Sequence, residues 1–134
     1  MGPVVVDASV VIAFRDREDA HHRAADRVLT SAHERGAQLV LPASAFAESL
    51  VRPLAAGITE ERATHALTRL FTVEPLTSDI AVAAARLRAT TKLRLPDALV
   101  VATGMRLDAD QILTCDQRWR GTDRRVRTVG AART

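Results

Sequence analysis

Cysteine is almost absent from this 134-residue sequence, because Cys115 is the only one. A single cysteine cannot form a disulfide within the chain, and the four histidines and Cys115 lack the spacing of a zinc site. Three of the histidines (His21, His22 and His33) fall in one amphipathic segment, where a solvated helix face is the expected role. No histidine is near Cys115 in sequence, so we expect this thiol to pack rather than to act as a nucleophile.

Aromatic residues are also few, with three Phe, one Trp and no Tyr. A platform that stacks the bases of a single-stranded nucleic acid is therefore not expected. Long apolar runs are missing too, because residues such as Asp7 and Glu48 interrupt them before the length of a membrane span is reached. The first residues lack the basic leader of a signal peptide. These features predict a cytoplasmic protein that is not anchored in a membrane.

The basic residues are almost all arginine, since 18 of the 19 are Arg and the formal net charge is +3. One basic stretch contains Arg86, Arg88, Lys92 and Arg94, and another runs over residues 117–134 with six Arg and one Asp. Arginine suits bidentate contacts with phosphate, so both stretches fit a polyanionic partner. They fit an ordinary solvated surface equally well, and a GC-rich genome would produce the same bias.

The chain alternates short β-rich runs with helical segments, which predicts a parallel sheet with helices on both faces in one domain over residues 1–134. In such sheets, sites form beyond the carboxyl ends of the strands, where Asp7 and Asp116 are expected. In the helix opened by Pro96, Met105 is expected on the buried side. The predicted strands are 3–7, 38–42, 73–76, 111–116 and 125–130. The predicted helices are 8–16, 19–36 and 43–56, with three more beginning near 59, 77 and 96.

Most of the sixteen acidic residues lie in polar stretches, but four lie in apolar surroundings: Asp7, Glu48, Asp97 and Asp116. Taken singly, Asp7 reads as a helix cap, Asp97 as a first-turn residue that favours the helix dipole, and Asp116 as the start of a turn. Glu48 is harder to explain, because an unpaired charge in the middle of an apolar helical segment is costly.

Taken together, four half-buried acids at one edge of a sheet would repel one another unless a cation neutralises them or they take up protons. Oxygen ligands select hard cations such as Mg²⁺ or Mn²⁺ over zinc. The chemistry that such a site suits is hydrolysis of a phosphodiester by a metal-activated water. No Walker loop, GxGxxG motif or Ser-His-Asp arrangement is found in the chain.

Four segments, "VVVDAS", "PASAFAESL", "LRLPDALVVATG" and "ILTCDQRW", resemble the four signature blocks of PIN domains, and most closely those of VapC-type toxins from bacterial toxin–antitoxin pairs. The resemblance covers nearly the whole chain in order and spacing, and the pair "PDALVVATG…ILTCD" is its most specific part. It implies a three-layer α/β/α PIN-like fold with a central, mainly parallel sheet. It also implies a metal-dependent ribonuclease.

The resemblance assigns Asp7, Glu48, Asp97 and Asp116 to the catalytic and metal site, with Mg²⁺ as the cofactor and Mn²⁺ as a substitute. Asp7 and Asp97 would be the most direct ligands, and Glu48 and Asp116 would complete the shell or hold waters. Two further positions, Ser9 and Thr114, match small hydroxyl residues beside the acids. They would bond a carboxylate or a water, although helix capping and strand-end bonding explain them equally well. Trp119 is expected to pack.

The same resemblance implies an RNA substrate, a homodimer and a cognate VapB-type antitoxin that lies in a groove leading to the acids. The alternatives are a PIN nuclease that processes RNA without being a toxin, and a catalytically silent RNA-binding PIN module. A haloacid-type phosphatase is disfavoured because Ser9 stands where a second Asp is required. A receiver domain is disfavoured because Lys92, the only lysine, precedes the "LPD" segment.

Overall fold

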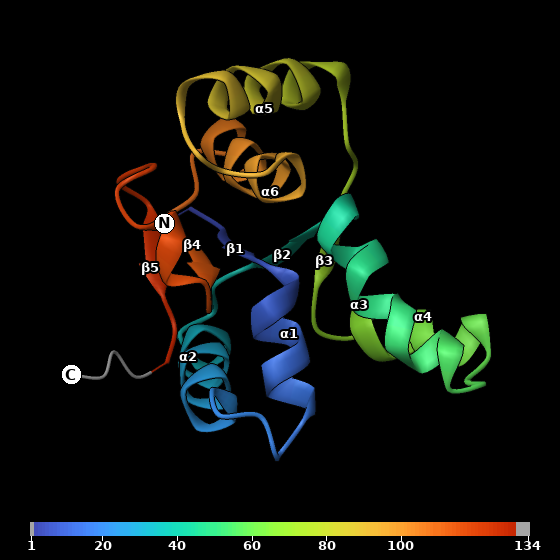
Figure 1. The fold of residues 1–134 in the computed structure, drawn as a ribbon. Coiled ribbons are helices and arrows are strands. Elements are labelled where there is room, and N and C mark those ends of the chain that lie inside the picture. The colour runs from blue at the N-terminus through green and yellow to red at the C-terminus, as the bar shows by residue number, and fades with distance from the viewer. Residues whose placement is uncertain (1, 131–134) are drawn as a thin grey trace.

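The computed structural model describes residues 2–130. Met1 and residues 131–134, which end both the predicted domain and the second basic stretch, lie outside the described part. At its centre is a sheet of five strands that are all parallel, in the order β3-β2-β1-β4-β5 (Figure 1). This confirms the predicted mainly parallel sheet. The strands are β1 (Val4–Val6), β2 (Leu39–Pro42), β3 (Thr72–Glu74), β4 (Gln111–Thr114) and β5 (Val126–Thr128).

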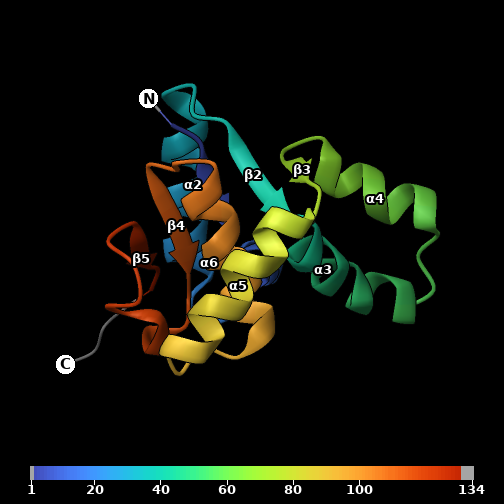
Figure 2. The same cartoon turned by 90° about the horizontal axis from the view of Figure 1, so that it is seen from above.

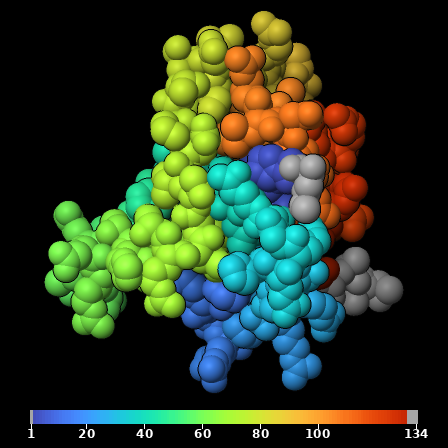
Figure 3. Space-filling model, turned by 180° about the vertical axis from the view of Figure 1, so that it is seen from behind, coloured from blue at the N-terminus to red at the C-terminus, as the bar shows by residue number. Residues whose placement is uncertain are grey.

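Helices cover both faces of the sheet, with α1 and α2 on one side and α5 and α6 on the other (Figures 1 and 2). This is the predicted three-layer α/β/α arrangement. The end of α3 and all of α4 form a lobe that projects from the body (Figure 3). The helices are α1 (Ala8–Arg15), α2 (His22–Glu34), α3 (Ala43–Ala55), α4 (Glu60–Thr68), α5 (Ser78–Thr90) and α6 (Leu95–Arg106), with a short 3-10 helix η1 (Gln117–Trp119).

The three valines of β1 form the centre of the core, and each is completely buried. Because helices cover both faces of a parallel sheet, its inner strands read as continuous apolar runs rather than as alternating ones. β1 pairs with β2 on one side and with β4 on the other. The strand order therefore reverses between β1 and β4, and the crevice beyond their carboxyl ends is where ligands bind in sheets of this kind.

Helix α6 lies very close to β4, and Gly104 makes this possible. A Cβ on Gly104 would collide with the side chain of Ile112 on β4. The missing side chain lets the buried face of α6 seat on the sheet, with Val100, Val101 and Ala102 all completely buried. This contact fixes α6, whose first turn carries Asp97, relative to the strand that ends at Thr114.

Several boundaries differ from the sequence prediction. Helix α2 begins at His22 rather than at residue 19, because the Asp19 side chain closes a turn by accepting a hydrogen bond from the amide of His21 at 2.8 Å. Helix α3 ends at Ala55, one residue earlier than predicted, and contains Pro53 in its interior. Strand β4 ends at Thr114, two residues earlier than predicted. Among residues 2–130, no helix combines the length and the apolar character needed to cross a bilayer.

Candidate active site

The carboxylate of Asp7 lies at the carboxyl end of the central strand, with only 7% of the residue exposed. Its Oδ2 accepts hydrogen bonds from the hydroxyls of Ser9 at 2.7 Å and Thr114 at 3.0 Å. Although Asp7 occupies the N-cap position of α1, its side chain makes no capping hydrogen bond. Of the two roles that the sequence left open, the structure therefore does not support capping. The side chain is instead held toward β4.

The two hydroxyls tie the end of β1 to the end of β4. Ser9 Oγ accepts a hydrogen bond from the amide of Cys115 at 3.0 Å, and Thr114 Oγ1 accepts one from the amide of Asp116 at 3.1 Å. Each hydroxyl thus donates to Asp7 and accepts from the chain that follows β4. Both roles considered for Ser9 and Thr114, carboxylate bonding and strand-end bonding, are present at once.

The surroundings of Asp7 disfavour the ionised form of its carboxyl group. Burial raises the pKa of Asp7, and the negative charge of Asp97 raises it further, while the hydrogen bonds from Ser9 and Thr114 act in the opposite direction. A buried carboxylate of this kind is stabilised either by a proton or by a nearby cation.

Asp97 lies in the first turn of α6, close to the other acids, with 19% of its side chain exposed. Desolvation raises the pKa of Asp97, and the charge of Asp116 adds to this effect. Arg94 lowers it, because its Nε lies 3.7 Å from Asp97 Oδ2. The expected first-turn position is therefore confirmed. Even so, the net effect of the surroundings is to disfavour the ionised form.

Glu48 lies on α3 and is exposed, which contradicts the expectation that it is half-buried on an apolar segment. Its pKa is nevertheless raised, first by partial desolvation and then by the charges of Asp7 and Asp97. The structure thus brings Glu48 within electrostatic reach of two other predicted site residues from a third element.

Asp116 differs from the other three acids because Arg118 holds it. Arg118 donates from Nε at 3.0 and 3.2 Å and from a terminal nitrogen at 2.6 Å to the two oxygens of Asp116, and its backbone amide adds a bond of 2.9 Å. The pKa of Asp116 is lowered, chiefly by these side-chain hydrogen bonds. Asp116 also caps η1, so the turn role considered for it is confirmed.

The four acids are electrostatic neighbours, but they do not form a closed cage. Over residues 2–130, no three acidic, His or Cys side chains converge closely enough to hold a metal ion as they stand. The donor set still fits a hard cation, because it offers only carboxylate oxygens and because Asp7, Glu48 and Asp97 all have raised pKa values from burial and mutual repulsion. A divalent cation would relieve that repulsion.

Two arginines at the site were not singled out by the sequence analysis, which placed Arg94 and Arg118 in general basic stretches. Each has a sequence signal: Arg94 precedes Asp97 by three residues, and Arg118 follows Asp116 by two. Both line a pocket of about 300 Å³ beside the acids. The lining residues are Lys92, Leu93, Arg94, Asp97, Asp116, Arg118 and Trp119.

Cys115 and Trp119 contribute to packing. Burial raises the pKa of the Cys115 thiol to about 11, so it is not a thiolate at neutral pH. Only 1% of Trp119 is exposed. The expectation that Trp119 packs in the core is confirmed.

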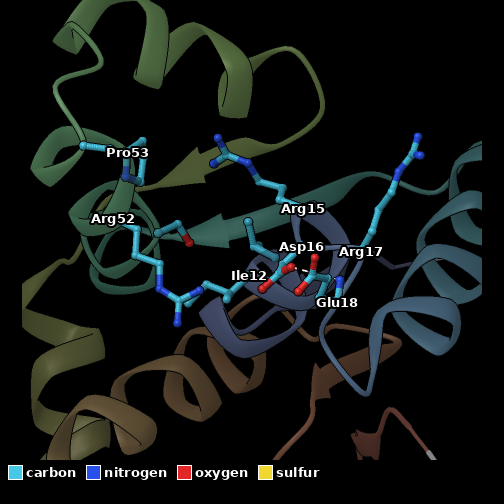
Figure 4. Close-up of a pocket in the computed structure, with 10 residues that line it drawn as sticks. Ile12, Arg15, Asp16, Arg17, Glu18, Arg52 and Pro53 are labelled. Carbon is cyan, nitrogen blue, oxygen red and sulfur yellow. Dashed lines mark hydrogen bonds between the residues drawn. The ribbon is translucent and has the colours of Figure 1, made fainter.

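A second hollow, of about 430 Å³, lies between the end of α1 and the second half of α3 (Figure 4). We call it the α1–α3 groove. Its walls include apolar side chains such as Ile12 and Pro53, and the arginines Arg15, Arg17 and Arg52 extend around it (Figure 4). The full lining is Val11, Ile12, Arg15, Asp16, Arg17, Glu18, Ser49, Arg52, Pro53 and Ala56.

Comparison with family models gives a match to the PIN domain over residues 4–125. The chain belongs to the PIN-domain family. The resemblance drawn from the four sequence blocks is therefore confirmed, and the matched range contains all four predicted acids. No curated protein matches the sequence at a significant level.

Several solved structures with the same fold come from bacterial toxin–antitoxin systems. A toxin–antitoxin complex from Klebsiella pneumoniae is 25% identical with a TM-score of 0.77, over 93% of this PIN domain chain and 96% of that one. VapC20 of Mycobacterium tuberculosis, a toxin that cleaves the sarcin–ricin loop, is 20% identical with a TM-score of 0.64, over 81% and 86% of the two chains. VapBC2 of Rickettsia felis, bound to promoter DNA, is 9% identical with a TM-score of 0.71, over 94% and 98%. The last two comparisons support the fold alone.

Proposed function

We propose that this PIN domain is a metal-dependent ribonuclease that acts as the toxin of a toxin–antitoxin pair. The observation that carries the proposal is the buried carboxylate of Asp7, held by Ser9 and Thr114 at the carboxyl end of the central strand. The repulsion that Asp7 shares with Asp97 and Glu48 gives the site a need for a cation. PIN-family membership and the VapC20 neighbour support RNA as the substrate.

In this proposal Asp7 and Asp97 would hold Mg²⁺, or Mn²⁺ in its place, and Glu48 and Asp116 would complete the shell or hold waters. The cation would supply Lewis-acid activation of the phosphodiester and of the attacking water. Ser9 and Thr114 keep Asp7 Oδ2 in one orientation, which fixes one carboxylate before the cation arrives. Glu48 is exposed, and partial desolvation with the charges of Asp7 and Asp97 raises its pKa, which favours a role in accepting a proton from an attacking water.

The toxin role is supported by structural neighbours such as the Klebsiella toxin–antitoxin complex, which is 25% identical. Similar folds occur in FitAcB of Neisseria gonorrhoeae and in VapBC-1 of Haemophilus influenzae.

We propose a VapB-type antitoxin as the partner, and the α1–α3 groove as its docking site. The apolar walls of the groove suit the apolar face of an amphipathic segment. Its three arginines outnumber its two acids, Asp16 and Glu18, so acidic residues on that segment are favoured. A basic antitoxin residue would then reach the acids. A homodimer in the cytoplasm completes the proposal.

Expression in a bacterial host tests the toxin role. We expect the wild type to arrest growth when expressed alone, and co-expression of the protein encoded by the adjacent gene to relieve the arrest. Harmless expression of a protein that cleaves RNA in vitro would identify a PIN nuclease for RNA processing instead. Harmless expression of a protein that binds RNA without cleaving it would identify a silent RNA-binding module.

A further inference from the structure

The pocket beside the acids carries more positive than negative charge. Lys92, Arg94 and Arg118 contribute three cations to its wall, against the two carboxylates of Asp97 and Asp116. Its volume of about 300 Å³ is sufficient for a phosphate group with its sugar. Arg94 is also the N-cap residue of α6, so the positive end of that helix faces the same region. The surroundings therefore favour an anion next to a site that itself favours a cation.

The two arginines are held in place mainly by the carboxylates. Arg118 contacts both oxygens of Asp116, and Arg94 Nε approaches Asp97 Oδ2 at 3.7 Å. The arginine side chains themselves are 77% and 72% exposed. Because the guanidiniums are mostly exposed, they can leave their carboxylates without being buried unpaired. A phosphate offers Arg118 the same two-oxygen geometry that Asp116 gives it, so the exchange replaces one charged pair with another.

We infer that Arg94 and Arg118 exchange their carboxylate partners for a backbone phosphate of RNA when the acids take up a cation. The pocket is then the subsite for the phosphate next to the scissile one. This inference rests on the proposed ribonuclease function. A guanidinium binds a phosphate through two parallel hydrogen bonds, as Arg118 now binds Asp116, with Nε donating to Oδ1 and a terminal nitrogen donating to Oδ2. In the free protein, the same arginines act as counter-ions that compete with the metal for Asp97 and Asp116.

This double role makes an unusual prediction: removing Arg118 tightens metal binding and weakens RNA binding. Arg118→Ala keeps the backbone amide that Asp116 caps, so η1 retains its cap. Arg118→Gln is a second variant in case the alanine variant fails to fold. Arg106→Ala is a matched control, because Arg106 also pairs with an aspartate, Asp79, at 3.1 Å but lies at the far end of α6 from Asp97.

Two measurements on the full chain test the inference. Titration with Mn²⁺, followed by electron paramagnetic resonance of the free ion, should give an affinity about fivefold higher for Arg118→Ala than for wild type. RNA affinity is measured in the presence of Mn²⁺ by the anisotropy of a short fluorescein-labelled single strand whose backbone resists cleavage, so that all the metal-binding acids are kept. In this assay, Arg94→Ala and Arg118→Ala should each reduce the slope of log K against log salt by about 0.7.

The control Arg106→Ala should give wild-type values in both measurements. If Arg94→Ala and Arg118→Ala also give wild-type values while the protein cleaves RNA, the phosphate subsite is overturned. A wild type that neither cleaves RNA nor binds Mn²⁺ would instead overturn the ribonuclease function, and the subsite with it. A change in stability alone, with the salt slope and the Mn²⁺ affinity unchanged, would assign the arginines a structural role and would also overturn the inference.

Discussion

The hydroxyl of Thr114 donates a hydrogen bond of 3.0 Å to the carboxylate of Asp7, although 107 residues separate the two in sequence. The parallel pairing of β1 with β4 brings them together. The amide of Asp7 extends this pairing by donating a hydrogen bond of 2.9 Å to the carbonyl of Leu113. The central pair of strands therefore builds the core and orients the first carboxylate of the site at the same time.

Removing the Thr114 hydroxyl should reduce cleavage without unfolding the protein. We expect Thr114→Val to lower the rate by about 10- to 100-fold, as for groups that orient metal ligands. Because this hydroxyl lowers the pKa of Asp7, the acid limb of the pH–rate profile should move to higher pH. Thr114→Ser, which keeps a hydroxyl, is the matched control and should retain most of the activity. Equal losses in both variants, with no movement of the acid limb, would assign Thr114 a packing role only.

The stability of the metal-free protein should depend on pH through Asp7. Its pKa is raised in the fold, chiefly by burial, so the folded protein holds this proton more tightly than the unfolded chain does. That contribution is complete below the ordinary value of 3.8 and is lost as the pH rises through the raised pKa. Asp7→Asn should therefore gain stability relative to wild type as the pH rises. Urea unfolding in EDTA at several pH values measures the difference.

Carboxylates with a lowered pKa, such as Asp116, act in the opposite direction but are present in both proteins, so they cancel from that difference. A difference that is constant with pH, or that shrinks as the pH rises, would show that Asp7 is not the destabilising group. Added Mg²⁺ should stabilise the wild type near neutral pH and have a smaller effect on Asp7→Asn.

Gly104 should be required for the seating of α6 on the sheet. Gly104→Ala places a methyl group against Ile112, and overpacking of this kind costs about 1–3 kcal/mol, which outweighs or cancels the gain of about 1 kcal/mol in helix propensity. In an Ile112→Ala background the same change should become neutral or stabilising, because the space is open. Urea unfolding of the four proteins gives the coupling energy. Additive effects would show that the two residues do not compete for space.

Charge reversal in the α1–α3 groove should separate antitoxin binding from catalysis. The double variant Arg15→Glu/Arg52→Glu should bind the antitoxin at least about tenfold more weakly, because two favourable charge contacts become repulsive, and it should still cleave RNA. Calorimetric titration with purified antitoxin measures the affinity. Arg86→Glu, on the helix layer at the opposite face of the sheet, is the control. A double variant that binds as tightly as this control would exclude the groove as the docking site.

The alternation of apolar runs and helical segments was sufficient to predict the layers and the strands, because a buried parallel strand such as "VVV" has few other interpretations. The same alternation placed Asp7 at the carboxyl end of the first strand and Asp97 in the first turn of a helix. Each position follows from where a strand ends or a helix begins. The tie between Asp7 and Thr114 depends on which strands become neighbours, and β1 and β4 are far apart in sequence. Local patterns carry no direct signal for that pairing.

The environment of Glu48 was predicted wrongly for a geometric reason. Phe46 and Leu50 are each two residues away, and residues two apart lie on opposite sides of a helix, so apolar neighbours at this spacing do not imply burial. The prediction that Met105 lies on the buried side of its helix was also wrong. Met105 is 36% exposed, because it lies in the last turn of α6 and faces a hollow against α5. The pairing of Asp116 with Arg118 depends on side-chain directions in a turn, which sequence patterns do not determine.

Cleavage of a labelled RNA with and without Mg²⁺ tests whether the four acids form a metal-dependent catalytic site. The wild type should cleave in Mg²⁺ and stop in EDTA, and Asp97→Asn should lose at least about 100-fold of the rate while keeping its circular dichroism spectrum, because a direct metal ligand has been removed. Asp79→Asn, at the other end of the α5–α6 layer, is the control and should cleave like the wild type. Cleavage that persists in EDTA, or full activity of Asp97→Asn in Mg²⁺, would show that the acids do not hold a catalytic metal.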